Sequence, residues 1–143
     1  KNEKKQILTE LSDESRTIIL YEAPHRLIKT LKQLFEYFGD RKISIVRELT
    51  KLHEEVLRGN LSNIIADYES GRVAVRGEYV LVIEGKSLLE KRNERQKSFE
   101  EISIKEHFDK YISEGLDKKE AMKAVAKDRG IQKREVYKEL LGE

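Results

Sequence analysis

Three short apolar runs, rich in β-branched residues, constrain the fold more than any other feature of this sequence. They are TIILY, ISIVREL and YVLVIE, at residues 17–21, 43–49 and 79–84. Runs of this length and composition are typical of β-strands. The first and third are continuously apolar, which favours strands that are covered on both faces.

Helical patterns separate these strands. After the first strand, apolar residues recur along one helical stripe, and Gly39 stands where a C-terminal cap is expected: Leu27, Ile28, Leu31, Leu34, Phe35 and Phe38. A second pattern begins after Asn60, a preferred N-cap residue, and ends before Gly71. Strands that alternate with helices predict an α/β fold, with a mixed sheet of about four to five strands flanked by helices.

The character of the chain changes after Gly85. Residues 86–103 are dense in charge and poor in core-forming side chains, so they are predicted to be a charged linker or a solvated helix. Three short helical patterns follow, with Asp117 and Glu120 at capping-box spacing before the middle one. We therefore expect an α/β domain at 1–85, a linker at 86–103 and a small helix-turn-helix-like unit at 104–143.

Composition excludes several classes of site. The sequence has no cysteine, which excludes a disulfide framework, a thiolate nucleophile and a cysteine zinc site, and which fits a cytoplasmic protein. It has no HExxH pattern, so no metal is expected, and no GxGxxG loop for a nucleotide. No apolar run approaches the roughly 20 residues of a membrane span, so no membrane partner is expected. With 29 basic and 27 acidic residues, bulk charge says little about nucleic acid.

The stretch YEAPHR, residues 21–26, concentrates functional groups directly after the first strand. Pro24 suits the first position of a helix, so this stretch is predicted to lie where a strand ends and a helix begins. Ligands of α/β proteins bind beyond the carboxyl ends of strands, where Glu22, His25 and Arg26 would fall. The alternative is purely structural: Glu22 pairs with Arg26 across the turn, and His25 caps the helix.

Two further motifs flank the other strands. RELTKLHEE, at residues 47–55, mixes both charge signs after the second strand, and it is equally typical of a solvated connection. In RGEYVLVIEG, Gly77 and Glu78 precede the third strand. Gly77 permits either a turn or a close approach of the backbone to a ligand, and the turn is the commoner case.

The C-terminal stretch AVAKDRGIQKREVYKEL resembles a helix-turn-helix. Lys133, Arg134 and Lys138 would meet phosphates from its last helix, which gives an alternative function as a non-catalytic nucleic-acid-binding module. A plainer possibility is that this unit packs against the main domain or a second chain through Val125, Ile131, Tyr137 and Leu140.

The three motifs YEAPHR, RELTKLHEE and GEYVLVIEG, taken in order, resemble the C-terminal half of the ribosomal RNA small-subunit methyltransferase I family, within the tetrapyrrole methylase superfamily. The resemblance implies transfer of a methyl group from S-adenosylmethionine to the 2′-hydroxyl of a cytidine in 16S ribosomal RNA of the small ribosomal subunit. It also implies two α/β domains, with the donor between them, and a homodimer. The N-terminal domain with its glycine-rich donor loop is absent from this sequence, so the chain alone is expected to be inactive.

The resemblance also implies roles for individual residues. The residues expected to border the donor cleft are Glu22, Ala23, Glu78 and Tyr79. Those expected to hold the RNA are His25, Arg26, Arg47 and Lys51. The reaction needs an aligned hydroxyl and an acceptor for its proton, and the catalytic candidates for that acceptor are Glu22 and His25.

Overall fold

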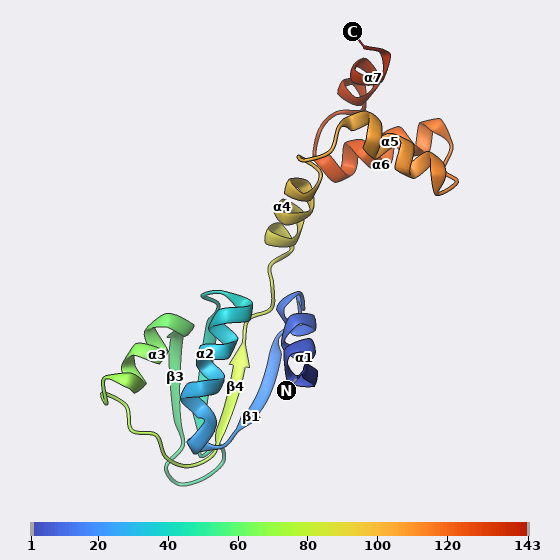
Figure 1. Cartoon of the computed structure of the whole chain (residues 1–143). Coiled ribbons are helices and arrows are strands. Elements are labelled where there is room, and N and C mark those ends of the chain that lie inside the picture. The colour runs from blue at the N-terminus through green and yellow to red at the C-terminus, as the bar shows by residue number, and fades with distance from the viewer. Residues whose placement is uncertain (1, 143) are drawn as a thin grey trace. The chain divides into compact units, whose positions relative to one another are not determined.

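The chain divides into two compact units in a computed structural model that describes residues 2–142 (Figure 1). The first unit ends at Ser87 and the second begins at Leu88. Residues 1 and 143, which belong to the first and last predicted segments, lie outside the described residues. Each unit is described by itself below.

The first unit is an α/β domain built around a four-stranded sheet, so the expected fold class is confirmed. Its elements are α1 (Asn2–Ser12), β1 (Ile18–Glu22), the 3-10 turn η1 (Pro24–Arg26), α2 (Leu27–Phe38), β2 (Lys42–Arg47), β3 (Glu55–Asn60), α3 (Leu61–Glu69) and β4 (Tyr79–Ile83). The strand order is β1-β4-β2-β3. Within this sheet every neighbouring pair is antiparallel, rather than mixed. Strand β4 lies between β1 and β2 and runs opposite to both, and β3 runs opposite to β2.

Strand β3 had no counterpart among the predicted strands. Its sequence, EVLRGN, contains only two large apolar residues, and most of its side chains are exposed or partly exposed. Among the described residues it pairs only with β2, so it forms an edge of the sheet. An edge strand buries little surface, which explains why no apolar run marked it.

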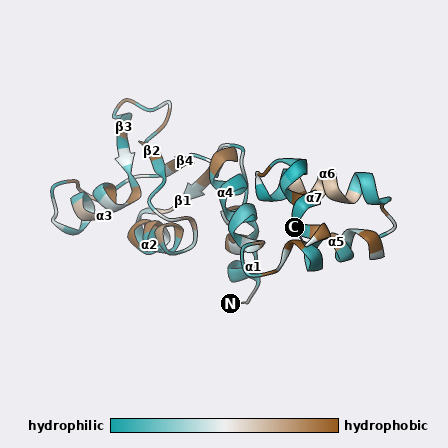
Figure 2. Cartoon of the chain, turned by 90° about the horizontal axis from the view of Figure 1, so that it is seen from above, coloured by the Kyte–Doolittle hydropathy of each residue, from teal (hydrophilic) through white to brown (hydrophobic). Residues whose placement is uncertain are grey.

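The core of the first unit lies between the sheet and its helices. Figure 1 shows α1, α2 and α3 on one face of the sheet, and buried side chains of the helices and strands form one cluster there. Leu27, Leu31 and Leu34 of α2 are fully buried in it, and brown and teal segments alternate along this helix in Figure 2.

The opposite face of the sheet is not covered at β1. There Ile19 and Tyr21 are 59% and 82% exposed, so the prediction that this strand is covered on both faces is wrong. Its burial alternates along the strand because, within the described residues of the first unit, helices pack on one face only.

The second unit consists of α4 (Leu88–Ser98), α5 (Ile104–Ser113), α6 (Lys118–Arg129) and α7 (Lys133–Leu141). Helix α4 falls inside the segment expected as a charged linker, and it contacts α6 through an ion pair of 2.8 Å between Arg95 and the buried Asp128. Asp117 caps α6 by accepting a hydrogen bond of 2.8 Å from the N–H of Glu120.

The core of the second unit is formed by α5, α6 and α7. Val125, Ala126 and Val136 are buried in it, and Ile131 and Leu140 pack against them. Of the side chains proposed for an interface, Val125, Ile131 and Leu140 therefore belong to this core, whereas Tyr137 is exposed. Among residues 2–142, no helix is both long and apolar enough to cross a membrane.

Candidate functional site

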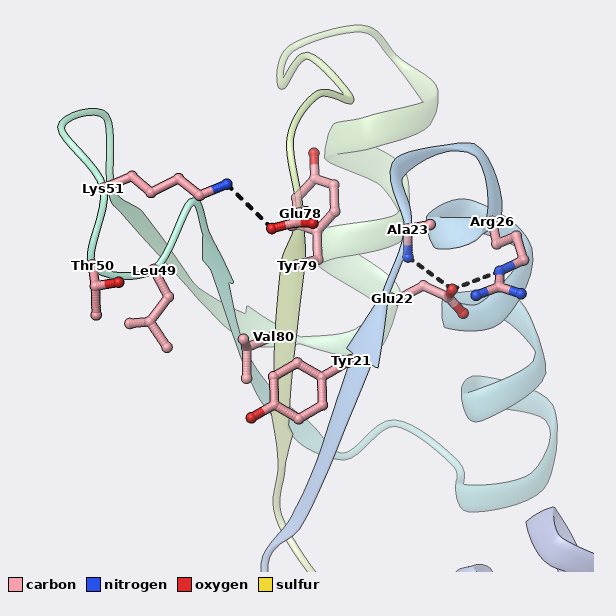
Figure 3. Close-up of a pocket in the computed structure, with 10 residues that line it drawn as sticks. All are labelled: Tyr21, Glu22, Ala23, Arg26, Leu49, Thr50, Lys51, Glu78, Tyr79 and Val80. Atoms are coloured by element: carbon pink, nitrogen blue, oxygen red, sulfur yellow. Dashed lines mark hydrogen bonds and ion pairs between the residues drawn. The ribbon is translucent and has the colours of Figure 1, made fainter.

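A hollow of about 440 Å³ opens at the end of the sheet where β1 stops and β4 starts. Figure 3 shows its three sources: the end of β1 with the turn after it, the loop after β2, and the first residues of β4. The lining residues are Tyr21, Glu22, Ala23, Arg26, Leu49, Thr50, Lys51, Glu78, Tyr79 and Val80. The antiparallel register brings them together, because Tyr79 lies opposite both Glu22 and Arg47.

Glu22 organises the turn after β1. Its carboxylate accepts hydrogen bonds from the N–H of Ala23 at 2.9 Å, from Nε of Arg26 at 2.8 Å and from the Thr30 hydroxyl at 2.6 Å. Burial alone would raise the pKa of Glu22, since its side chain is only 9% exposed, but the three donors together hold that pKa below its usual value. Glu22 is therefore an ionised anchor that joins β1, the turn and α2.

The turn itself has the predicted position at a junction of strand and helix. Ala23 is extended, Pro24 begins η1, and the N–H of Arg26 donates to the Ala23 carbonyl at 3.1 Å. The ion pair between Glu22 and Arg26 that the structural alternative predicted is present. His25 does not cap the helix; its side chain is exposed, and the N-cap position of α2 belongs to Arg26.

The loop after β2 forms the opposite wall and holds an unusual backbone. Glu48 and Thr50 have φ values of 53° and 66°, which residues with a Cβ rarely adopt. The N–H of Glu48 donates to the Glu78 carbonyl at 3.0 Å, and Lys51 Nζ lies 3.1 Å from the Glu78 carboxylate and 3.4 Å from that of Glu48. The Glu78 and Glu48 carboxylates raise the pKa of Lys51, so its ammonium stays charged.

Gly77 allows this loop and the start of β4 to approach each other. Its φ is +74°, and a Cβ there would meet the Glu48 side chain, with Cδ only 2.8 Å away. The Glu48 carboxylate instead accepts a hydrogen bond of 2.8 Å from the N–H of Glu78. Gly77 thus serves both as a turn residue and as a point of close approach, and the approaching group is Glu48.

The structure brings most of the predicted site residues together. Glu22, Ala23, Arg26, Lys51, Glu78 and Tyr79 all line the hollow. Tyr79 does so while its ring packs edge-on against Tyr68, and its hydroxyl accepts from the N–H of Arg76 at 2.9 Å.

His25 and Arg47 do not line this hollow. Arg47 is buried and pairs at 2.6 Å with Glu55, which lies opposite it on β3. Motif position alone did not distinguish Arg47 from Lys51, although the alternation along β2 places Arg47 on the same face as the buried Ile43 and Ile45.

Four lining residues were missed from the sequence: Tyr21, Leu49, Thr50 and Val80. Tyr21 lies on the face of β1 opposite to that of Ile18 and Leu20, which could have marked it as exposed. The whole run is apolar, however, so the sequence does not show this alternation of faces. These residues give the hollow an apolar part, and Arg26, Lys51 and Glu78 add charge of both signs. Such a site suits a ligand that combines a flat ring with charged groups. Within residues 2–142 no cluster of three or more metal-ligating side chains is present.

Comparison with known proteins gives one consistent name. The chain is 47% identical over 137 residues to "Ribosomal RNA small subunit methyltransferase I" of Bacillus subtilis, a match that covers 96% of this chain and 46% of that protein. Proteins of the same name in Halalkalibacterium halodurans and Synechocystis sp. are 39% and 36% identical, over 96% and 94% of this chain and 46% of each relative. No protein-family model matches the chain.

The chain spans about half the length of the curated relatives it matches, and the matched part is their C-terminal half. The match covers both units, since it extends over nearly the whole chain, including the helices after Ser87. Over the C-terminal half that it spans, the chain therefore belongs to the ribosomal RNA small subunit methyltransferase I family.

Proposed function

We propose that this chain forms the C-terminal part of an enzyme that methylates the 2′-hydroxyl of a cytidine in 16S ribosomal RNA, acting in the cytoplasm as a homodimer. The observation that carries the proposal is the meeting of all three motifs in one hollow. The name of the relatives supports ribosomal RNA of the small subunit as the substrate class.

In this proposal the hollow is one wall of the cleft for the methyl donor, and an N-terminal domain supplies the other. S-adenosylmethionine would supply the methyl group. The residues present fit such a ligand: the exposed Tyr21 ring offers a stacking surface, and the Glu78 carboxylate, 82% exposed, offers acceptors for an amine or hydroxyl. Arg26 and Lys51, at opposite sides of the hollow in Figure 3, would hold RNA phosphates.

The proton of the attacking hydroxyl needs an acceptor on the enzyme. The Glu22 carboxylate already accepts three hydrogen bonds, which favours its role as an anchor over a role as the proton acceptor. His25 is exposed, and its ring nitrogens form no hydrogen bond or ion pair with residues 2–142. His25 does not line the hollow, but it belongs to the turn between the lining residues Ala23 and Arg26. We therefore propose His25 as the acceptor and Glu22 as the residue that positions this turn.

A chimaera tests this function. The corresponding half of the Bacillus subtilis relative is replaced by this chain, and transfer of a radiolabelled methyl group to small-subunit RNA is measured. A 2′-O-methylated cytidine is recognised because alkali does not cleave the bond after it. We expect labelled, alkali-resistant cytidine, and a large loss of transfer in the Glu78→Ala and Arg26→Ala variants.

The matched controls are Glu36→Ala and Lys29→Ala, which change exposed charges on α2 that do not line the hollow. Transfer that is unchanged in the site variants and equal to that of these controls would refute the assignment of the hollow. An active chimaera whose label is released by alkali would refute the 2′-hydroxyl as the target.

A further inference from the structure

A lysine stripe runs along the outer face of α6 in the second unit. Lys119, Lys123 and Lys127 are spaced four residues apart, so they lie on one side of the helix along about 12 Å. All three are exposed, whereas Ala121 and Val125 on the other side are buried in the core of the unit. The stripe therefore takes no part in packing the helices.

The stripe lacks internal neutralisation. Within the described part of the chain, none of its three ammonium groups has an ion-pair partner. The acidic side chain that α6 carries toward the core, Asp128, is buried and is bound to Arg95. Glu120 borders the stripe but leaves this face with an excess of positive charge.

The helix that bears the stripe belongs to a helix-turn-helix arrangement. Helix α6 ends at Arg129 and is capped by Gly130, which adopts a left-handed conformation; α7 begins three residues after Gly130 (Figure 1). The N–H of Ile131 donates to the Ala126 carbonyl at 3.0 Å and closes the turn. In such motifs the first helix crosses the nucleic-acid backbone and carries contacts to phosphates.

We propose that the second unit is an RNA-binding module in which Lys119, Lys123 and Lys127 contact the phosphate backbone without reading its sequence. The choice of RNA rests on the function proposed above, whose substrate is ribosomal RNA. Sequence-independent contact fits the geometry, because the side chains are flexible point charges rather than planar groups matched to base edges. The module would add affinity for the substrate while the hollow of the first unit aligns the reacting hydroxyl.

The test measures the affinity of the 143-residue chain for RNA. The probe is a fluorescein-labelled single strand of about 30 nucleotides, titrated by fluorescence anisotropy between about 50 and 200 mM KCl. The variant K119Q/K123Q/K127Q removes the stripe. Loss of three phosphate contacts should weaken binding by about tenfold or more and make the slope of log K against log salt less negative by about 2.

A matched control, K97Q/K105Q/K110Q, removes the same charge from exposed positions on α4 and α5 of the same unit. A third variant, K133Q/R134Q/K138Q, removes the basic side chains of α7. Circular dichroism establishes that each variant keeps its helices. The proposal holds if the stripe variant loses affinity and salt dependence while the control does not.

Three results would overturn it: no measurable binding by the unsubstituted chain, equal losses in the stripe and control variants, or a loss confined to the α7 variant. These outcomes are separate from the fate of the proposed function. Methyl transfer by the chimaera depends on the hollow, so active transfer without a stripe effect on RNA affinity would reject the module and leave the enzyme assignment standing.

Discussion

Replacing Thr30 by valine tests the anchoring role of Glu22 without changing the volume of the core. The Thr30 hydroxyl donates to the Glu22 carboxylate at 2.6 Å, and both side chains are largely buried. A hydrogen bond to a charged group contributes about 1.5–3 kcal/mol, so we expect the variant to lose about 2 kcal/mol of stability. For a unit of this size, that loss lowers the melting temperature by roughly 10 °C, measured by circular dichroism.

The pH dependence of this loss distinguishes hydrogen bonding from packing. Because the folded-state pKa of Glu22 lies below its ordinary value of 4.5, its carboxylate stabilises the fold fully above that pH and progressively less as pH falls through the folded pKa. The difference between Thr30→Val and the unsubstituted chain should therefore be full near about pH 7 and shrink below about pH 4. The control Thr30→Ser keeps the hydroxyl. A valine variant as stable as the serine variant at neutral pH, or a gap independent of pH, would refute the reasoning.

Three other substitutions probe the backbone around the site. Gly85→Ala should cost about 2 kcal/mol in urea denaturation, because a Cβ there would collide with the carbonyl oxygens of Ser15 and Arg16; unchanged stability would show that this segment yields. Asp40→Ala should lower the stability, since the Asp40 carboxylate accepts from the N–H and hydroxyl of Ser62 in the first turn of α3. Those two donors lower the pKa of Asp40, so this cost should fade in melts at acidic pH, and a constant cost would argue against the cap. Thr50→Gly should raise the melting temperature, with a gain of up to about 1 kcal/mol, by relieving a positive φ; a decrease would show that the loop is not strained.

The sequence predicted those parts of the fold in which burial and periodicity agree. Helix α2 was predicted from its apolar stripe, and that stripe does pack on the sheet. The helices after residue 103 were predicted from their helical patterns, capping residues and Gly130. Strand β3 was not predicted because it lies at an edge and has few apolar residues. The exposed face of β1 was not predicted because Ile19 and Tyr21 are as apolar as their buried neighbours. Apolar character alone does not reveal which face of a strand a helix covers.

The sequence predicted those lining residues of the hollow that belong to short motifs at the ends of strands. Glu22 at the end of β1 and Glu78 directly before β4 both line the hollow because β1 and β4 are paired, a relation that the sequence does not encode locally. The same limit explains Arg47, whose position at the end of β2 resembled that of a ligand-binding residue although its partner, Glu55, comes from the following strand. Predicting that ion pair required knowledge of β3, the strand that the sequence did not mark.

Charge pairing explains why the balanced composition does not reveal where the surface carries unpaired positive charge. The first unit neutralises many of its cations within itself, as in the pairs Lys32–Glu69 at 2.5 Å and Arg72–Asp67 at 2.8 Å. The outer face of α6 has no such pairs in the part of the chain that the structure describes, so a chain with a net charge of only +2 still presents a local surface for anions. Exposed pairs contribute at most about 1 kcal/mol, whereas contacts with a polyanion depend steeply on salt. Rising salt should therefore weaken RNA binding through α6 well before it affects the stability of the first unit, and equal sensitivity of the two would contradict this division of charge.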